Sequence, residues 1–235
     1  MKTTAELKAE AKDILRGKWG KAVLLNLIPT LLTVGVLIFA TLSGLAWYSI
    51  HGTDTYLLSS VVEYQQNSPE GGGVSLVSSI ISALFTSGIT WTYLDLLRKE
   101  RSEIQPLKDV FRGFQGAYIG GVILLTLLST MFTTLWMLLF MIPGIVKIYA
   151  YSQCYFIYYD QIQQTGEKPK VLDTITASRR LMKGHKKRLL WLDITFLGWY
   201  IMIGLTLGIA GLWVMPYVSA TRAAFYEDLQ KNAQQ

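Results

Sequence analysis

The sequence predicts an all-α, polytopic membrane protein, because the chain has few charges and contains long segments without any. Of its 235 residues, 51% are hydrophobic and 16% are charged, whereas about 25% are charged in an average soluble domain. A helix needs about 20 predominantly apolar residues to cross the hydrocarbon core of a bilayer. Residues 22–47, 74–94 and 117–142 meet this length and contain no Asp, Glu, Lys or Arg.

Three further segments complete a prediction of six transmembrane helices. Residues 189–209 are apolar apart from Asp193, and two shorter segments, residues 145–159 and 210–226, are interpreted as the return legs of hairpins. The sequence therefore predicts three transmembrane hairpins within a single membrane domain, residues 1–235. The first apolar segment exceeds the 7–15-residue core of a secretory signal peptide, so we expect it to be retained.

The positions of Lys and Arg predict the orientation of the chain. Six precede the first crossing, five lie between the second and third, eight lie between the fourth and fifth, and residues 48–73 contain none. Because segments rich in Lys and Arg stay inside, we expect both termini on the cytoplasmic face of the plasma membrane. The net charge of +6 then indicates attraction to anionic membrane lipids. Nucleic acid is not an expected partner, since the sequence has no polar region rich in aromatic residues for base stacking.

A cation followed by glycine recurs ahead of three apolar segments. Each pair follows a predicted amphipathic helix, and helices with one apolar and one basic face tend to lie in the headgroup plane. Glycine reaches positive φ without steric cost, so each glycine is expected to bend the chain into the membrane. The pairs are Arg16-Gly17, Arg112-Gly113 and Lys183-Gly184.

The three amphipathic helices are expected at residues 4–15, from Pro106 onward and at residues 171–182, with apolar and charged side chains on opposite faces. In the first, the expected apolar face consists of Leu7, Ala11, Ile14 and Leu15. In the second, Leu107, Val110 and Phe111 are expected opposite Lys108, Asp109 and Arg112.

The return legs of the hairpins share a second pattern, an aromatic residue followed by an acid. The sequences MIPGI (141–145) and GIAGL (208–212) also align, and they predict tight outer turns at Pro143, Gly144 and Gly211. We therefore predict a pseudo-threefold repeat of amphipathic helix, glycine bend and hairpin, comparable to transporters built from parallel repeats. The alternative is that amphipathic entrances and aromatic belts recur in any polytopic protein. The predicted repeats are residues 3–99, 104–164 and 170–230, and the pairs are Tyr93 with Asp95, Tyr159 with Asp160, and Tyr226 with Glu227.

Polar residues inside the predicted crossings are candidate functional residues, because ionisable groups are costly in a bilayer. Asp193 is expected to pair with Arg188 or Arg222, and the alternative is a proton or substrate relay. Lys147 is expected at the outer end of the fourth crossing, where it either reaches lipid phosphates or binds a solute or partner. Asn26 inside the first crossing adds to the case for a transporter or channel.

The basic residues near the amphipathic helices are candidates for binding anionic lipid, and the alternative is that they serve as an inside-positive anchor. These candidates are Arg16, Arg112, Arg179, Arg180, Lys183, Lys186, Lys187 and Arg188. We expect no metal, cofactor or catalytic site, because the chain has one cysteine (Cys154), two histidines (His51 and His185) and no recognised catalytic motif.

Several stretches resemble a known family: MIPGIVKIYAYSQ (141–153), SRRLMKGHKKRLLWLDITFLGW (178–199) and LWVMPYVSATRAAFYEDL (212–229), with AKDILRGKWG (11–20). With its PGI-x-K and S-x-x-L-M-K-G-x-K motifs, the chain resembles uncharacterised integral membrane proteins of Gram-positive bacteria that are grouped as a domain of unknown function. More distantly it is similar to the membrane-embedded part of some glycerophosphodiester phosphodiesterases. The resemblance implies a membrane location and a helical fold, and it implies no activity.

The leading hypothesis is a non-enzymatic integral membrane protein that interacts with anionic lipids, a membrane-protein partner or a second copy of itself. A role in envelope stress or in protection against antimicrobial peptides would be consistent with this. A small-solute transporter or channel is the alternative, and a lipid-modifying enzyme is the least supported.

Overall fold

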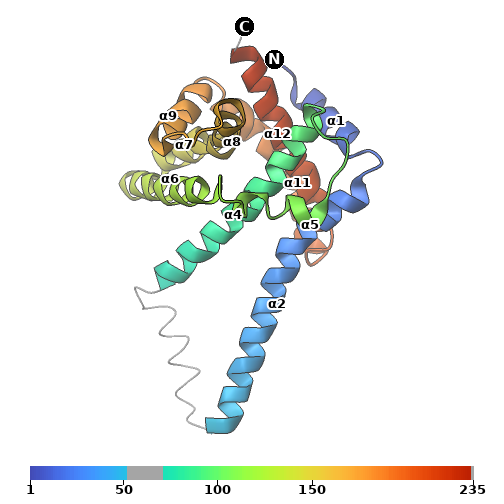
Figure 1. Ribbon diagram of the computed structural model, residues 1–235, viewed down its shortest axis with the longest axis vertical. Helices are drawn as coiled ribbons and strands as arrows, with labels where there is room; N and C mark the ends of the chain where they lie inside the picture. Colours follow the sequence, from blue (N-terminus) through green and yellow to red (C-terminus); the bar gives the residue numbers. More distant parts are fainter. Residues whose placement is uncertain (52–70, 234–235) are drawn as a thin grey trace.

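The computed structural model describes residues 1–51 and 71–233, and every secondary-structure element among them is a helix (Figure 1). The prediction of an all-α protein is therefore confirmed. The predicted long outer loop, residues 48–73, falls mostly outside the described residues. The helices are α1 (Thr4–Leu15), α2 (Trp19–His51), α4 (Gly71–Leu97), α5 (Pro106–Asp109), η1 (Arg112–Phe114), α6 (Ile119–Leu139), α7 (Met141–Tyr151), α8 (Cys154–Thr165), α9 (Val171–Leu181), α10 (Lys186–Ile194), α11 (Leu197–Leu205) and α12 (Gly211–Ala233).

Within the described residues, three helical segments are long and apolar enough to cross a membrane: Leu76–Leu97, Ile119–Leu139 and Lys186–Leu205. The third segment consists of α10 and α11, which a short break separates. The helix α2 contains 33 residues, so it is about 50 Å long at 1.5 Å per residue, and it extends away from the other helices (Figure 1). The predicted crossing at residues 145–159 is not one helix, because α7 ends at Tyr151 and α8 begins at Cys154.

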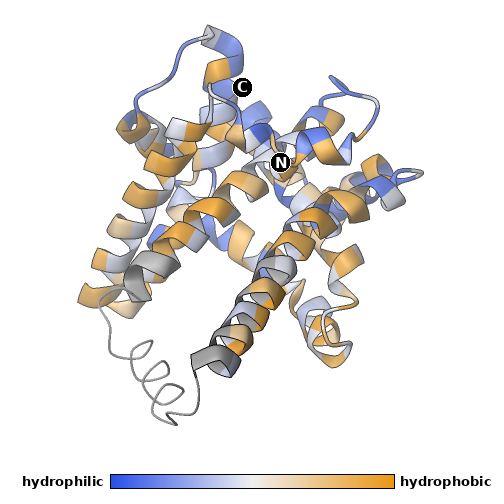
Figure 2. Cartoon of the chain, turned by 60° about the horizontal axis from the view of Figure 1, so that its bottom comes forward, coloured by the Kyte–Doolittle hydropathy of each residue, from blue (hydrophilic) through white to orange (hydrophobic). Residues whose placement is uncertain are grey.

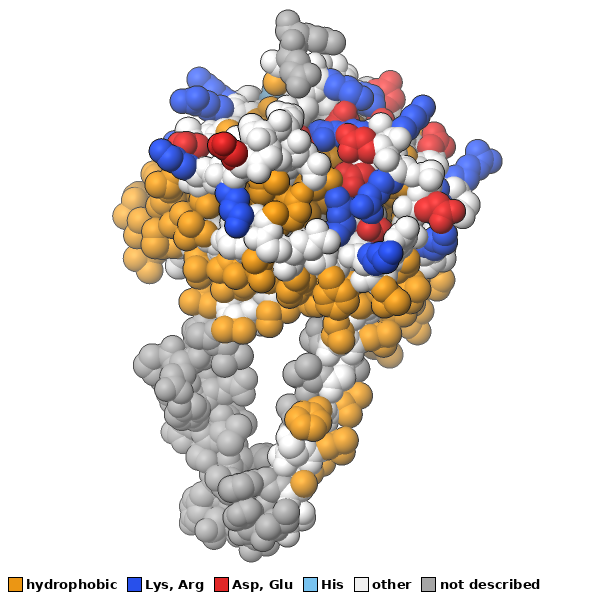
Figure 3. All heavy atoms as spheres, viewed as in Figure 1, with side chains coloured by type: hydrophobic (Ala, Val, Ile, Leu, Met, Phe, Trp, Pro, Cys, Tyr) orange, Lys and Arg blue, Asp and Glu red, His pale blue; other side chains and the backbone are white. Residues whose placement is uncertain are grey.

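Charged and apolar side chains occupy different levels of the molecule. Lys, Arg, Asp and Glu side chains gather near the end that carries both termini, and hydrophobic side chains form a band below them (Figure 3). The same division is visible along the helices when they are coloured by hydropathy (Figure 2). Such a division suits a protein whose apolar band faces hydrocarbon and whose charged end faces water.

The helices α4, α8 and α12 meet through two equivalent contacts. Trp91 of α4 stacks on Tyr159 of α8, with ring centroids 5.0 Å apart, and the Tyr159 hydroxyl donates to Asp95 at 2.8 Å. Phe156 of α8 stacks on Tyr226 of α12 at 4.8 Å. The Tyr226 hydroxyl then donates to Asp160 at 2.7 Å. In both contacts an aromatic residue four positions before an acid packs on the tyrosine that binds that acid.

Buried ion pairs connect the same helices. Arg98 contacts Asp160 at 2.6 Å and Glu227 at 2.8 Å, and Arg112 contacts Asp95 at 2.9 Å. All three acids are buried. Because an uncompensated charge in such a place is strongly unfavourable, these acids serve to hold the helices together.

The amphipathic helices α1 and α9 pack their apolar faces against the protein. Leu7, Ala11 and Leu15 of α1 are buried, and this helix packs against α12. Its N-terminus is stabilised by a capping box between Thr3 and Glu6. In α9, the buried Ser178 donates to the carbonyl of Ala150 at 2.8 Å. The predicted amphipathic faces are present and are largely buried in the protein core, while Leu172 of α9 is exposed.

The second amphipathic helix differs from the prediction. The helix α5 has 4 residues and is followed by a short 3-10 turn. Asp109 and Arg112, expected on the charged outer face, are buried, whereas Leu107 is 71% exposed. The reason is specific pairing, since Asp109 binds Arg101 at 2.6 Å and Arg112 binds Asp95. Arg112, a predicted lipid ligand, is therefore used within the fold.

Two of the three predicted glycine bends have the expected backbone. Gly17 has φ +75° and Gly184 has φ +85°, in the left-handed region that glycine adopts without strain. Gly113 does not have a positive φ. It is required for another reason, because a Cβ there would lie 2.1 Å from the carbonyl oxygen of Leu84.

The outer turns lie close to their predicted positions but not at the predicted residues. Between α6 and α7 the chain turns at the extended Phe140. Pro143 and Gly144 already belong to α7, and a Cβ at Gly144 would clash with Met137. The second turn uses Leu207 and Gly208, with φ 51° and 93°. Gly211 is the first residue of α12 and does not form the bend.

Candidate functional site

A pocket of about 300 Å³ gathers basic side chains from three parts of the chain. Lys147 comes from α7, Arg179 and Arg180 come from the end of α9, and Lys183 and Lys186 come from the following turn and the start of α10. We call this the basic pocket. Its remaining lining residues are Ala150 and Thr176.

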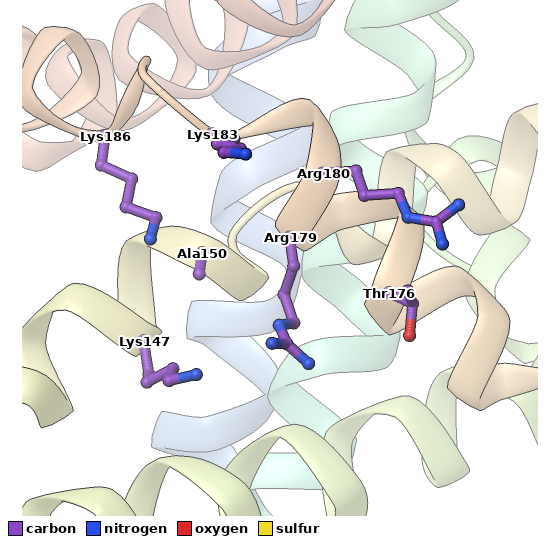
Figure 4. A pocket seen from close by; sticks show the side chains of 7 residues that line it. All are labelled: Lys147, Ala150, Thr176, Arg179, Arg180, Lys183 and Lys186. Atoms are coloured by element: carbon purple, nitrogen blue, oxygen red, sulfur yellow. The ribbon is translucent and has the colours of Figure 1, made fainter.

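The side chains of the basic pocket lie around Arg179, with Lys183 above it in the view of Figure 4. On one side, Lys147 and Lys186 point toward the same space as Arg179, and on the other side lie Arg180 and Thr176. Lys147 is close enough to Arg179 and Lys186 for mutual repulsion. Its ammonium also lies 4.5 Å from the ring centroid of Trp136, a cation–π contact that holds it in place.

Lys147, which the sequence predicted at the outer end of the fourth crossing, lines the same pocket as Arg179. The helix α7 has 11 residues, about 16 Å at 1.5 Å per residue, and it ends at a break before Cys154. The lining of the basic pocket includes Lys147 together with Arg179, Arg180, Lys183 and Lys186. Lys147 and the cluster around Arg179 therefore share one site.

The cations of the basic pocket have no acidic partner in the part of the chain that the structure describes. The ion pairs among the described residues involve none of these five cations. By contrast, Arg188, a predicted lipid ligand, contacts Asp228 at 2.6 Å and is therefore used within the fold. Of the other predicted ligands, Lys187 and Arg16 are exposed and line no part of the basic pocket.

A second pocket, of about 520 Å³, lies between α2, α4, α11 and α12. We call it the interhelical pocket. It brings together Asn26 and Arg222, two residues that the sequence singled out as polar groups inside crossings. Arg222 contacts Asp193 at 3.0 Å, which confirms the predicted pairing of this acid. Asp193 thereby neutralises the charged residue that lines the pocket.

Polar side chains reach the interhelical pocket at helical spacing. Asn26 and Thr30 are four residues apart on α2, and Ser82, Thr86 and Thr90 follow the same spacing on α4, so each set lies on one helix face. Asn26 also donates to the Tyr93 hydroxyl at 2.9 Å. Apolar residues make up the rest of the wall, including Phe85, Ile203 and Met215.

Some residues of these sites were not identified from the sequence. Thr176 lies three residues before Arg179 and four before Arg180, so it shares a helix face with them, and this spacing could have identified Thr176. The contribution of Trp136 arises from the packing of α6 on α7, which no local pattern records. Within the described residues, no group of three or more His, Cys, Asp or Glu could hold a metal ion.

The fold and the two pockets define an all-helical protein with membrane-spanning candidates and an uncompensated basic pocket at the level of its charged end. The chain belongs to the family described as protein of unknown function (DUF975). The family's sequence profile matches residues 1–150 and residues 142–233, which together cover nearly the whole chain. No curated protein and no solved structure matches it.

Proposed function

We propose that the protein is a non-enzymatic, multi-pass protein of the plasma membrane that binds the headgroups of anionic phospholipids in the basic pocket. The observation that carries the proposal is the convergence of Lys147, Arg179, Arg180, Lys183 and Lys186 without a carboxylate partner among the described residues. Gathering like charges is unfavourable unless an anion compensates them. Guanidinium groups suit phosphate because they donate two parallel hydrogen bonds to it.

The surroundings of the basic pocket suit a lipid. Ile145 and Ile148 of α7 and Leu190 and Trp191 of α10 are exposed apolar side chains on the helices that supply Lys147 and Lys186. A phosphate held in the pocket would leave acyl chains beside these residues. Each basic residue near a membrane surface contributes about 1 kcal/mol of attraction to anionic lipid.

The same proposal includes a multi-pass topology in which α2 and the three candidate spans cross the membrane, with both termini on the cytoplasmic side. The separation of charged and apolar side chains supports this orientation (Figure 3). The recurrence of the stacked Tyr–acid contact between α4 and α8 and between α8 and α12 supports a repeated unit. The tyrosines of these contacts directly precede an acid, as Tyr159 precedes Asp160 and Tyr226 precedes Glu227. On α4 the residue before Asp95 is Leu94, so α4 cannot supply the tyrosine for a third contact of this kind.

The lipid proposal can be tested with charge-matched double variants. Arg179→Gln with Lys186→Gln removes two cations from the basic pocket, and Arg16→Gln with Lys187→Gln removes two exposed cations outside it. Binding of phosphatidylglycerol to the purified protein would be measured by native mass spectrometry, with phosphatidylcholine as the neutral lipid. We expect the first variant to bind phosphatidylglycerol about tenfold more weakly, equivalent to about 1.4 kcal/mol, and the second to change binding less than twofold. Equal losses in both would mean that the cations act as a general anchor.

The interhelical pocket favours a second candidate function, the passage of a small polar solute. Polar side chains at helical spacing inside apolar helices are typical of solute pathways. In a Cys154→Ala background, Ser82→Cys and Thr86→Cys would react with a water-soluble thiol reagent if the pocket is filled with water. Thr134→Cys, on the exposed side of α6, is the control and should not react. Protection of all three positions would exclude a water-filled route.

A further inference from the structure

The residues of the basic pocket indicate the chemical class of the ligand as well as its negative charge. We infer that the pocket recognises a ligand with two linked phosphoryl groups, either a lipid diphosphate or a free diphosphate. This inference rests on the proposed function, because it refines the ligand class of the same site.

The first argument is the balance of charge. Lys147, Arg179, Arg180, Lys183 and Lys186 line one pocket without an acidic partner in the described residues. The phosphodiester of an ordinary phospholipid carries a single negative charge, which would leave most of these cations uncompensated. A phosphate monoester carries about −1.5 to −2 at neutral pH, and a second linked phosphoryl group adds to that charge. The ligand that best compensates the pocket therefore has more than one phosphoryl group.

The second argument is the division of the pocket into two halves. Lys147, Lys186 and Arg179 surround one space, and Arg180 with Thr176 lies on the opposite side of Arg179 (Figure 4). Arg179 stands between them, and its planar guanidinium has five N–H donors, enough to contact two neighbouring phosphoryl groups. The Thr176 hydroxyl adds an uncharged donor to the second half. The pocket thus offers cationic groups on both sides of Arg179, with the guanidinium of Arg180 pointing away from that of Arg179 (Figure 4).

The third argument is size. A volume of about 300 Å³ lies at the lower end of the range of about 300–1,000 Å³ that small-molecule pockets occupy. Such a pocket accommodates a compact headgroup and not a whole lipid. A hydrocarbon chain would have to leave the pocket, and the exposed Ile148 and Trp191 offer an apolar surface on the adjoining helices.

The test compares ligands that differ by one phosphoryl group. Binding of farnesyl diphosphate, farnesyl monophosphate, inorganic diphosphate and inorganic phosphate to the purified full-length protein would be measured by calorimetry in a neutral detergent. We expect farnesyl diphosphate to bind at least tenfold more tightly than the monophosphate. Inorganic diphosphate that binds as tightly as farnesyl diphosphate would identify a free anion as the ligand, and weaker binding would identify a lipid.

Variants assign the two halves of the pocket. Lys147→Gln and Arg180→Gln each remove a cation from a different half, and Lys186→Gln serves as a second variant of the first half. Each should weaken binding of the diphosphate about tenfold, whereas Lys187→Gln, which removes an exposed cation outside the pocket, should change it less than twofold. Equal affinity for monophosphate and diphosphate would overturn the inference and leave the proposed lipid site intact. No preference for phosphatidylglycerol over phosphatidylcholine would instead overturn the proposed function itself.

Discussion

Arg98 is the residue on which the junction of the three central helices depends most. It contacts Asp160 with two hydrogen bonds, at 2.6 and 2.8 Å, and Glu227 with a third at 2.8 Å. Asp160 and Glu227 are 4% and 8% exposed, so neither can regain full hydration when the arginine is lost. The pair of acids on two different helices therefore requires a cation between them.

Arg98→Gln should destabilise the protein by about 3 kcal/mol, because it leaves the buried Asp160 without a counter-charge and leaves Glu227 with only the exposed Lys231, at 3.3 Å. Lys21→Gln is the matched control. Its partner Glu103 lies at 2.9 Å, but both side chains are at least half exposed, and such a pair contributes less than about 1 kcal/mol. Thermal unfolding in detergent, followed by tryptophan fluorescence, would measure both. Equal stability of the two variants would show that the junction is held by packing alone.

Asp228 gives the protein a stability that depends on pH. Burial tends to raise the pKa of Asp228, but hydrogen bonds from Arg188 and from the backbone N–H of Lys2 outweigh it and hold the pKa below its ordinary value. A carboxyl whose pKa is lower in the folded state stabilises that state above its unfolded pKa, about 4. This contribution is lost as the pH falls through the folded pKa.

Asp228→Asn should therefore be less stable than the wild type at pH 7, and the difference should shrink below about pH 4. Unfolding midpoints measured between pH 3 and pH 7 would show this convergence. A difference that stays constant over this range would mean that the charge of Asp228 contributes nothing and that only its shape matters.

At the scale of the helix, the sequence predicts correctly those helices that depend on the spacing of their own residues. It predicts wrongly where residues distant in the sequence determine which side chains are buried. Residues 4–15 form α1 as expected, because apolar residues at helical spacing and a capping sequence act within the segment itself. The same reasoning failed for the segment that contains α5. Asp109 forms an ion pair with Arg101, and Arg112 forms one with Asp95, and both partners lie outside this segment. The break between α7 and α8, which brings Lys147 to the basic pocket, has no glycine or proline to indicate it.

The packing of α1 makes it a part of the core, and this can be measured. Leu7 is 1% exposed against α12, whereas Leu172 of α9 is 56% exposed. Leu7→Ala should cost about 2–4 kcal/mol, the range for a buried leucine, and Leu172→Ala should change stability by less than about 0.5 kcal/mol. The same thermal unfolding would compare them. If Leu7→Ala left stability unchanged and instead weakened association with vesicles, α1 would be a lipid-bound helix.

At the scale of the whole molecule, the distribution of charge supports a testable prediction of how the chain is oriented in a membrane. The basic pocket and both termini lie toward the charged end, and α2 carries the chain away from it (Figures 1 and 3). Ser49, near the end of α2, lies 30 residues beyond its start at Trp19, which corresponds to about 45 Å. That distance exceeds the hydrocarbon thickness of about 30 Å, so the two ends of α2 should face opposite sides of the bilayer.

Single cysteines in a Cys154→Ala background test this orientation directly. In intact cells, a membrane-impermeant maleimide should label Ser49→Cys and should leave Lys187→Cys and Arg16→Cys unlabelled until the membrane is opened. The physical reason for this expectation is the cost of moving clusters of Lys and Arg across the bilayer, which would keep both basic segments inside. Labelling of Lys187→Cys in intact cells would place the basic pocket on the outer face, where an inner-leaflet lipid could not reach it.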